Sequence, residues 1–155
     1  GLDYFFDFLD DDYEEDDIKE FGVKVVVKVR ADALDIERGV ISDLKSTTGN
    51  AAKKHDVMRS IATYKYDFST SLYLDVFTLG TGVTFDTFIW IFASKDFGNA
   101  KPWKSSQKNV MVGRAKWKKS VVELAKYISN GWKFTESLES IGPQSYDLEW
   151  LTEED

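Results

Sequence analysis

Apolar and polar positions alternate along "FGVKVVVKVRADAL" (residues 21–34), and this period of two is typical of a β-strand. "DIERG" (35–39) has the composition of a turn and ends in Gly39, and "VISDLKS" (40–46) predicts a second strand. Because so short a turn returns the chain alongside itself, we expect the two strands to form an antiparallel hairpin.

A helical period replaces the alternation after the hairpin. Apolar residues recur at helical spacing over about 51–63 and again over about 67–79, and the "YKY" between them predicts a bend. "GTG" (80–82) ends this region. The segment "TFDTFIWIFAS" (84–94) is strongly apolar, which predicts a long central strand whose aromatic side chains lie in the core.

The second half of the chain returns to polar sequence. Residues 96–108 are predicted to be a loop that contains Pro102, followed by a short strand at "NVMV" (109–112). "GRAKWKKSVVELAKYISNG" predicts an amphipathic helix closed by Gly131. The order β-β-α-β-β-α indicates an α/β fold, with a sheet flanked by helices.

Length and composition limit the class of protein. A chain of 155 residues with 43% apolar content is expected to form one domain with a single core. The absence of cysteine excludes disulfides, thiolate zinc sites and iron–sulfur clusters. No apolar run reaches the roughly 18 residues of a membrane helix and no signal peptide is visible, so we expect a cytoplasmic protein.

The net charge of −7 is unevenly distributed. Residues 1–20 hold ten acids and one lysine, and residues 147–155 hold five acids and no base. The domain between them, residues 21–146, keeps 12 acids and 19 bases, a net charge of +7 that suits a polyanion. We interpret the acidic ends as mobile or loosely docked segments, or alternatively as a DNA mimic or a protein-docking element.

Charged residues lie at the ends of the hairpin strands. Asp32 and Asp43 are eleven residues apart, so a tight hairpin can bring them together across the strand pair. Two adjacent carboxylates favour a hard divalent cation between them, and Lys45 projects from the same strand face as Asp43. This pattern is typical of metal-assisted phosphate chemistry, although exposed hairpin charges would give the same spacing.

"RADALDIERGVISDLKSTTG" resembles the core of the PD-(D/E)XK nucleases, and specifically the RecE-like (exonuclease VIII type) phage recombination exonucleases. The resemblance continues in order through three more segments, "YKYDFSTSLYLDVF", "TFIWIFASK" and "GRAKWKKSVVELAKYISNGWK", and spans roughly residues 21–135. It implies a restriction-endonuclease-like mixed sheet in which an antiparallel hairpin is flanked by helices.

The resemblance assigns roles to individual residues. Asp32 and Asp43 match the metal-binding carboxylates, Lys45 matches the catalytic lysine, and the carbonyl of Leu44 would be a further metal ligand. Tyr73 matches a helix tyrosine beside the scissile strand. The implied metal is Mg²⁺, with Mn²⁺ as a substitute.

Two positions depart from the family pattern. Ser69 stands where the family has glutamine, four residues before Tyr73 on the same helix face, and this shortens a contact to DNA or to metal-bound water. The family also uses a His or Glu from an upstream helix, whereas here a short acidic segment precedes the hairpin, and Glu20 or an acid in "DYEEDD" would take that role.

Several cations follow the motif. Four cations are predicted to contact phosphates or, alternatively, to form a solvated helix face, namely Lys53, Lys54, Arg59 and Lys65. The resemblance adds Ser69 as a DNA contact. His55 is interpreted as a surface residue. A basic group around Trp117 is either a backbone-binding patch or the charged face of an amphipathic helix, and comprises Arg114, Lys116, Lys118 and Lys119.

The residues predict metal-assisted phosphodiester hydrolysis, and the resemblance implies a Mg²⁺-dependent exonuclease that acts on linear double-stranded DNA. By resemblance it would act in phage-type recombination in a phage or bacterial host, often as a ring-shaped homo-oligomer with a single-strand annealing protein as partner. The alternative is a non-catalytic DNA-binding module that retains the nuclease fold.

Overall fold

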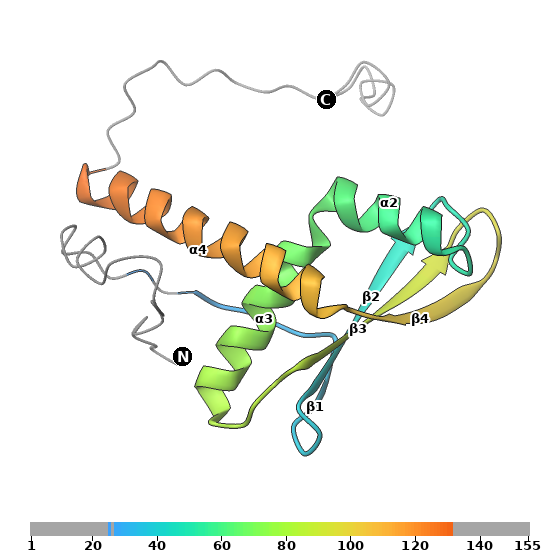
Figure 1. Ribbon diagram of the computed structural model, residues 1–155, viewed down its shortest axis with the longest axis horizontal. Helices are drawn as coiled ribbons and strands as arrows, with labels where there is room; N and C mark the ends of the chain where they lie inside the picture. Colours follow the sequence, from blue (N-terminus) through green and yellow to red (C-terminus); the bar gives the residue numbers. More distant parts are fainter. Residues whose placement is uncertain (1–24, 26, 132–155) are drawn as a thin grey trace, which may run out of the picture.

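The alternating and helical patterns form the elements of a computed structural model that describes residue 25 and residues 27–131. The elements follow in the order β1 (Ala33–Asp35), β2 (Val40–Thr47), α2 (Lys54–Tyr64), α3 (Tyr66–Thr81), β3 (Thr87–Ser94), β4 (Ala100–Lys104) and α4 (Gln107–Ser129). Figure 1 shows α3 beside the sheet and α4 packed across α3. The predicted α/β class is confirmed.

The four strands form one mixed sheet in the order β1-β2-β3-β4. β1 and β2 make the predicted antiparallel hairpin, β2 and β3 run parallel, and β3 and β4 are antiparallel. The parallel pair is in register from Val40 opposite Thr87 to Thr47 opposite Ser94, and α2 and α3 form the connection between its strands. The carboxyl ends of β2 and β3 therefore lie at the same edge of the sheet.

The core lies on one face of the sheet, beneath the helices. On β3, Phe88, Trp90 and Phe92 are at most 2% exposed, as their alternation predicts. Their neighbour Ile41 on β2 and Leu74 on α3 belong to the same apolar cluster. The other face is more open, and Leu44 on β2 is 59% exposed there.

The bend predicted at "YKY" is confirmed at Lys65. This residue separates α2 from α3 with a left-handed backbone conformation, φ 55° and ψ 39°, and its N–H donates to the carbonyl of Ile61. Side chains strain this conformation, so the break is a specific feature of the fold. At the end of α3, Gly82 takes a positive φ of 70° and closes the helix as expected.

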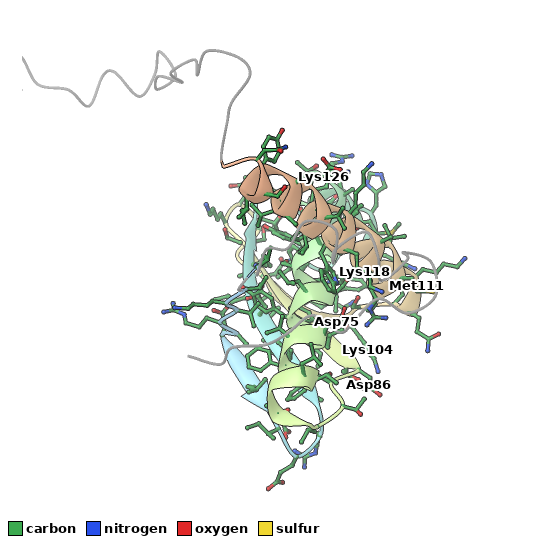
Figure 2. All side chains as sticks on the ribbon, turned by 90° about the vertical axis from the view of Figure 1, so that its left-hand side faces the viewer. Asp75, Asp86, Lys104, Met111, Lys118 and Lys126 are labelled. Atoms are coloured by element: carbon green, nitrogen blue, oxygen red, sulfur yellow. The ribbon has the colours of Figure 1, made fainter. Side chains whose placement is uncertain are left out.

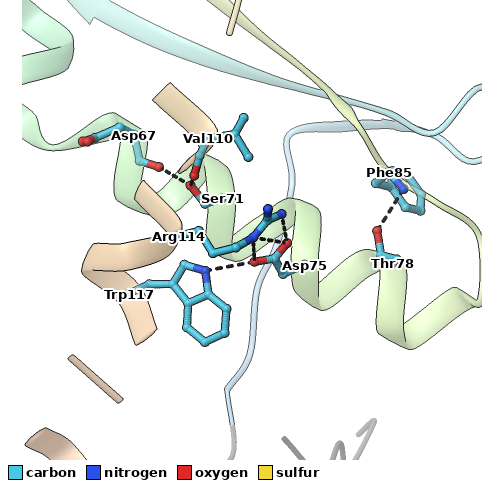
Figure 3. Close-up of polar contacts among 8 residues, drawn as sticks. All are labelled: Asp67, Ser71, Asp75, Thr78, Phe85, Val110, Arg114 and Trp117. Atoms are coloured by element: carbon cyan, nitrogen blue, oxygen red, sulfur yellow. Dashed lines mark hydrogen bonds and ion pairs between the residues drawn. The ribbon is translucent and has the colours of Figure 1, made fainter. Parts of the chain in front are cut away.

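The α3–α4 contact depends on a glycine and on buried polar groups. A Cβ built at Gly113 would lie 1.9 Å from the carbonyl oxygen of Asp67, so the helices approach too closely for a side chain. The carboxylate of Asp75 accepts from the Arg114 guanidinium and, at 3.0 Å, from Nε1 of Trp117 (Figure 3). These contacts fix α4 onto α3.

The strand predicted over 21–34 is wrong in its extent. Within the described residues, only Ala33–Asp35 pair with β2, and the chain from 27 to 32 is not a strand. The Asp32 carboxylate accepts from the backbone N–H of Leu44 at 2.8 Å, which satisfies that donor without strand pairing.

The strand predicted at "NVMV" is also wrong, because these residues lie in α4. Ser106 caps that helix by accepting from the N–H of Asn109 at 3.2 Å, so the helix begins earlier than predicted. The strand that follows β3 is β4, inside the segment predicted to be a loop. Pro102 is tolerated in it because β4 is an edge strand, where one side needs no ladder donor.

Parts of the predicted domain organisation lie outside the described residues. The acidic segments 1–20 and 147–155 are among them, as are both ends of the predicted domain 21–146. In the described part of the chain, no helix is long and apolar enough to cross a membrane.

Candidate functional site

The structure brings Asp32, Asp43 and Lys45 together. Asp43 and Lys45 alternate with outward residues on β2, so both project from the face that carries the core, opposite Trp90 and Phe92 of β3. Asp32 lies just before β1 and interacts directly with the Asp43 carboxyl group. Asp43 is 7% exposed, whereas Asp32 is open to solvent. The result is a half-buried acidic pair that solvent can reach from one side.

The pKa values of the two carboxyl groups are shifted in opposite directions. Burial raises the pKa of Asp43, and Asp32 raises it further, while the Lys45 ammonium opposes both effects. The backbone N–H of Leu44 lowers the pKa of Asp32, and a hydrogen bond from Asp43 lowers it again. Environments that push two neighbouring pKa values apart are common where proton transfer or cation binding takes place.

Lys45 is held between an acid and an aromatic ring. Its ammonium forms an ion pair with Asp43, and Nζ lies 4.7 Å from the ring centroid of Tyr66 on α3. Burial raises the pKa of the Tyr66 hydroxyl. Tyr66 is a site residue that the sequence analysis missed, although the repeated tyrosines of "YKY" were the available signal.

The two other residues predicted on α3 point elsewhere. Tyr73 packs edge-on against Phe88, with ring centroids 6.3 Å apart, on the core face of the sheet. The hydroxyl of Ser69 donates to the carbonyl of Tyr66 at 3.1 Å, within its own helix. Both lie on the helix that carries Tyr66, and their predicted roles remain predictions.

The cations predicted to contact phosphate are distributed around α2. Lys53 precedes the helix, Lys54 begins it and Lys65 follows it, and all three are exposed. Arg59 lines a cleft described below. His55 is exposed, with Nδ1 3.6 Å from the Asp56 carboxylate, a surface position as interpreted from sequence.

The basic group on α4 is partly neutralised by α3. Arg114 forms an ion pair with Asp75, and Lys116 forms one with Asp67, which is 6% exposed. Lys118 stands on α4 (Figure 2), and Lys119 beside it is exposed. Half of the proposed patch therefore fixes the two helices together, and Lys118 and Lys119 remain as candidates for DNA contact.

A cleft of about 370 Å³ opens at the edge where β2 and β3 end. One wall is a single face of α2, and the other consists of the last residue of β2 and residues that follow β2 and β3. Its lining comprises Thr47, Thr48, Gly49, Asp56, Arg59, Ser60, Thr63, Tyr64 and Asp96. Ligands of open α/β sheets commonly bind beyond the carboxyl ends of parallel strands.

No family model matches this chain, and no curated protein matches it. Among solved structures, it is similar to a crystal structure of a protein named "Putative exonuclease" from Eubacterium rectale, with 15% identity and a TM-score of 0.48. The match covers 70% of this chain and 46% of that protein, so the chain spans less than half of its length. A likeness at this level carries no conclusion about the chemistry of this chain.

Proposed function

We propose that this protein is a metal-dependent deoxyribonuclease that hydrolyses phosphodiester bonds of linear double-stranded DNA from its ends. The observation that carries the proposal is the cluster of Asp32, Asp43 and Lys45 on the core face of the hairpin. The motif "RADALDIERGVISDLKSTTG" supports it, because its acids and lysine are the residues that meet in space.

The acidic pair fits a divalent cation. Ionising both of two neighbouring carboxyl groups costs free energy through charge repulsion, and this cost is removed when one group keeps its proton or when a cation binds between them. Their oxygens suit Mg²⁺ or Mn²⁺, and the exposure of Asp32 gives an ion access to the buried Asp43. Asp32 and Asp43 would hold the ion, together with the carbonyl oxygen of Leu44. In the described part of the chain, no group of three or more acidic or histidine side chains forms a complete ligand set.

Each side chain has a separate task in this proposal. The bound ion would supply charge neutralisation at the scissile phosphate and a more acidic water. Lys45 would orient the attacking water and donate to a phosphate oxygen as negative charge develops there. Tyr66 restricts the position of the Lys45 ammonium by covering it with its ring. Lys53, Lys54 and Lys65 would contact the DNA backbone.

The second candidate is a DNA-binding module that retains the fold without cleaving DNA. Two observations favour it: the acidic ligand set within the described residues stops at two carboxylates, and the Ser69 hydroxyl bonds to its own helix. This candidate shares the basic surface of the first and differs only in chemistry.

The narrower assignment is also a proposal. The four sequence segments similar to RecE-like exonucleases support a role in phage-type DNA recombination. That role would involve a homo-oligomer around the DNA and a single-strand annealing protein as partner.

The decisive experiment incubates linear double-stranded DNA with the protein and Mg²⁺ or Mn²⁺, and in parallel with EDTA. Metal-dependent shortening from the ends supports the exonuclease, and it should disappear in Asp43→Ala while an Asp86→Ala control keeps it. DNA that is bound but never shortened rejects the nuclease and supports the module.

A further inference from the structure

The break between α2 and α3 places two tyrosine rings together. In a continuous helix, residues two apart point in different directions. Here the left-handed backbone of Lys65 lets the rings of Tyr64 and Tyr66 stack, with centroids 5.5 Å apart and planes 25° apart. Strained backbone conformations are concentrated at functional sites, so the strain at Lys65 indicates a function for the tyrosine stack that it creates.

The stack extends from the proposed catalytic site to the surface. The Lys45 ammonium lies over Tyr66, Tyr66 contacts Phe92 of the core, and Tyr64 lies at the outer end. Tyr64 is 63% exposed although one side of its ring faces Tyr66, so much of the rest of the ring is open. Tyr64 therefore provides an exposed aromatic surface supported from behind.

This aromatic surface lines the cleft at the end of β2. The α2 wall of the cleft follows the helix period, since Asp56, Arg59, Ser60, Thr63 and Tyr64 recur at spacings of three and four. The cleft lies further along β2 than the acidic pair. Thr47 in its other wall follows Asp43 and Lys45 on the same face of β2, which puts it roughly 13 Å from Asp43 along the strand.

The polar groups of the cleft suit a base better than a phosphate. The lining carries one guanidinium, from Arg59, and two carboxylates, from Asp56 and Asp96. A dianionic or monoanionic phosphate would be repelled by this excess of negative charge. The edge of a base has both donors and acceptors, and it can pair with carboxylate, hydroxyl and guanidinium groups.

We propose that this cleft binds an unpaired base at the end of a DNA strand, stacked on Tyr64. The choice of DNA rests on the proposed function, whereas the stacking site rests on Tyr64, Tyr66 and the lining of the cleft. Aromatic side chains bind successive bases of single strands in this way. The substrate class becomes a DNA end with at least one unpaired nucleotide, held on the same face of β2 as Asp43 and Lys45.

Binding measured without cleavage tests the inference. Fluorescence anisotropy in EDTA would compare a duplex with a short single-stranded overhang against the same duplex with an abasic overhang, in both polarities. Loss of the bases should weaken binding by the parent roughly 5- to 150-fold for one overhang polarity. The same change should have no effect on Tyr64→Ala, while Tyr64→Phe should behave like the parent.

The matched control is Tyr127→Ala, which removes a tyrosine that is 50% exposed on α4 and should keep the full dependence on the bases. If Tyr64→Ala lowers the melting temperature, Tyr64→Leu replaces it, because leucine can still pack on Tyr66 without an aromatic face. Equal affinity of the parent for normal and abasic overhangs overturns the inference, and so does a loss in Tyr64→Ala or Tyr64→Leu as large as the loss in the parent. Because no strand is cut in EDTA, base-dependent binding without metal-dependent cleavage would reject the nuclease alone.

Discussion

The carboxylate of Asp32 accepts a hydrogen bond from the backbone N–H of Leu44 at 2.8 Å, at the point where pairing between β1 and β2 ends. A side chain thus takes over from the strand ladder. The same hydrogen bond holds Asp32 beside Asp43. It therefore both ends the pairing of the hairpin strands and brings the two acids together.

Replacing Asp32 should change the titration of its neighbour. Asp32 is one of the groups that raise the pKa of Asp43, so Asp32→Ala should move the Asp43 pKa downward, although burial will still hold it above the ordinary value. Carboxyl NMR titration would measure this. Asp35→Ala is the matched control, because Asp35 pairs with Arg38 at the hairpin turn; a similar shift in that variant would contradict the assignment.

Asp43→Asn should be stabilising relative to the parent in a pH-dependent manner. The pKa of Asp43 is raised in the folded state, so the folded protein holds this proton more tightly than the unfolded chain. The parent therefore loses stability as pH rises from about 4 through the folded pKa, and the variant lacks this loss. The gain of the variant over the parent should be larger at pH 7 than at pH 3 in urea unfolding.

Added Mg²⁺ should stabilise the parent but not Asp43→Asn, and an equal response of both proteins would show that Asp43 does not bind the ion.

Lys45→Ala should separate binding of the ion from turnover. Lys45 lies beside the acids without being a ligand, so the variant should still be stabilised by Mg²⁺ in a thermal melt. Cleavage should fall by about 10²- to 10³-fold, as expected for a donor that acts in the transition state. Lys104→Ala on β4 is the control and should cleave normally. Loss of the Mg²⁺ response in Lys45→Ala would show that the lysine organises the carboxylates instead.

Lys65→Gly should stabilise the protein. Relief of the left-handed strain outweighs the extra flexibility that glycine gives the unfolded chain, for a net gain of about 0.5–1 kcal/mol. Lys65→Ala removes the same side chain but keeps the Cβ, so it should show no such gain. Urea unfolding of both variants would measure the difference, and equal stabilities would place the strain elsewhere.

Gly113→Ala should destabilise the α3–α4 contact. Within a helix this change normally helps by about 1 kcal/mol, but here the new Cβ would meet the backbone of Asp67. We expect a net loss of at least about 2 kcal/mol in the free energy of unfolding. Lys119→Ala, at an exposed position of the same helix, should change little. A neutral Gly113→Ala would mean that α4 can shift on α3 without cost.

The sequence predicts elements well where one signal dominates. Alternation on β2 and the apolar run of β3 identified the two central strands, and the spacing of Asp43 and Lys45 placed them on one face. "NVMV" failed because four residues cannot distinguish a strand from the first turn of a helix, and the deciding bond comes from Ser106. Pro102 argued against a strand that only its edge position permits.

The missing part of the site depends on tertiary structure. Tyr66 becomes a site residue because the Lys45 ammonium reaches its ring. The sequence predicts the helix break at Lys65, but it does not predict this contact between β2 and α3. The cleft similarly requires the end of β2 to meet one face of α2, which only the packed fold defines.

The register of β2 against β3 determines which face of the sheet Asp43 and Lys45 project from. A slip by a single residue would turn Asp43 and Lys45 to the open face and bring Leu44 inward. Burial of Leu44 in place of Asp43 and Lys45 would favour the slipped register locally, so the two charged residues cannot fix the register themselves. Ile41 opposite Phe88 holds it instead, since both are at most 2% exposed and would lose their packing in the slipped pairing. An apolar pair that takes no part in the proposed chemistry thus fixes the positions of Asp43 and Lys45.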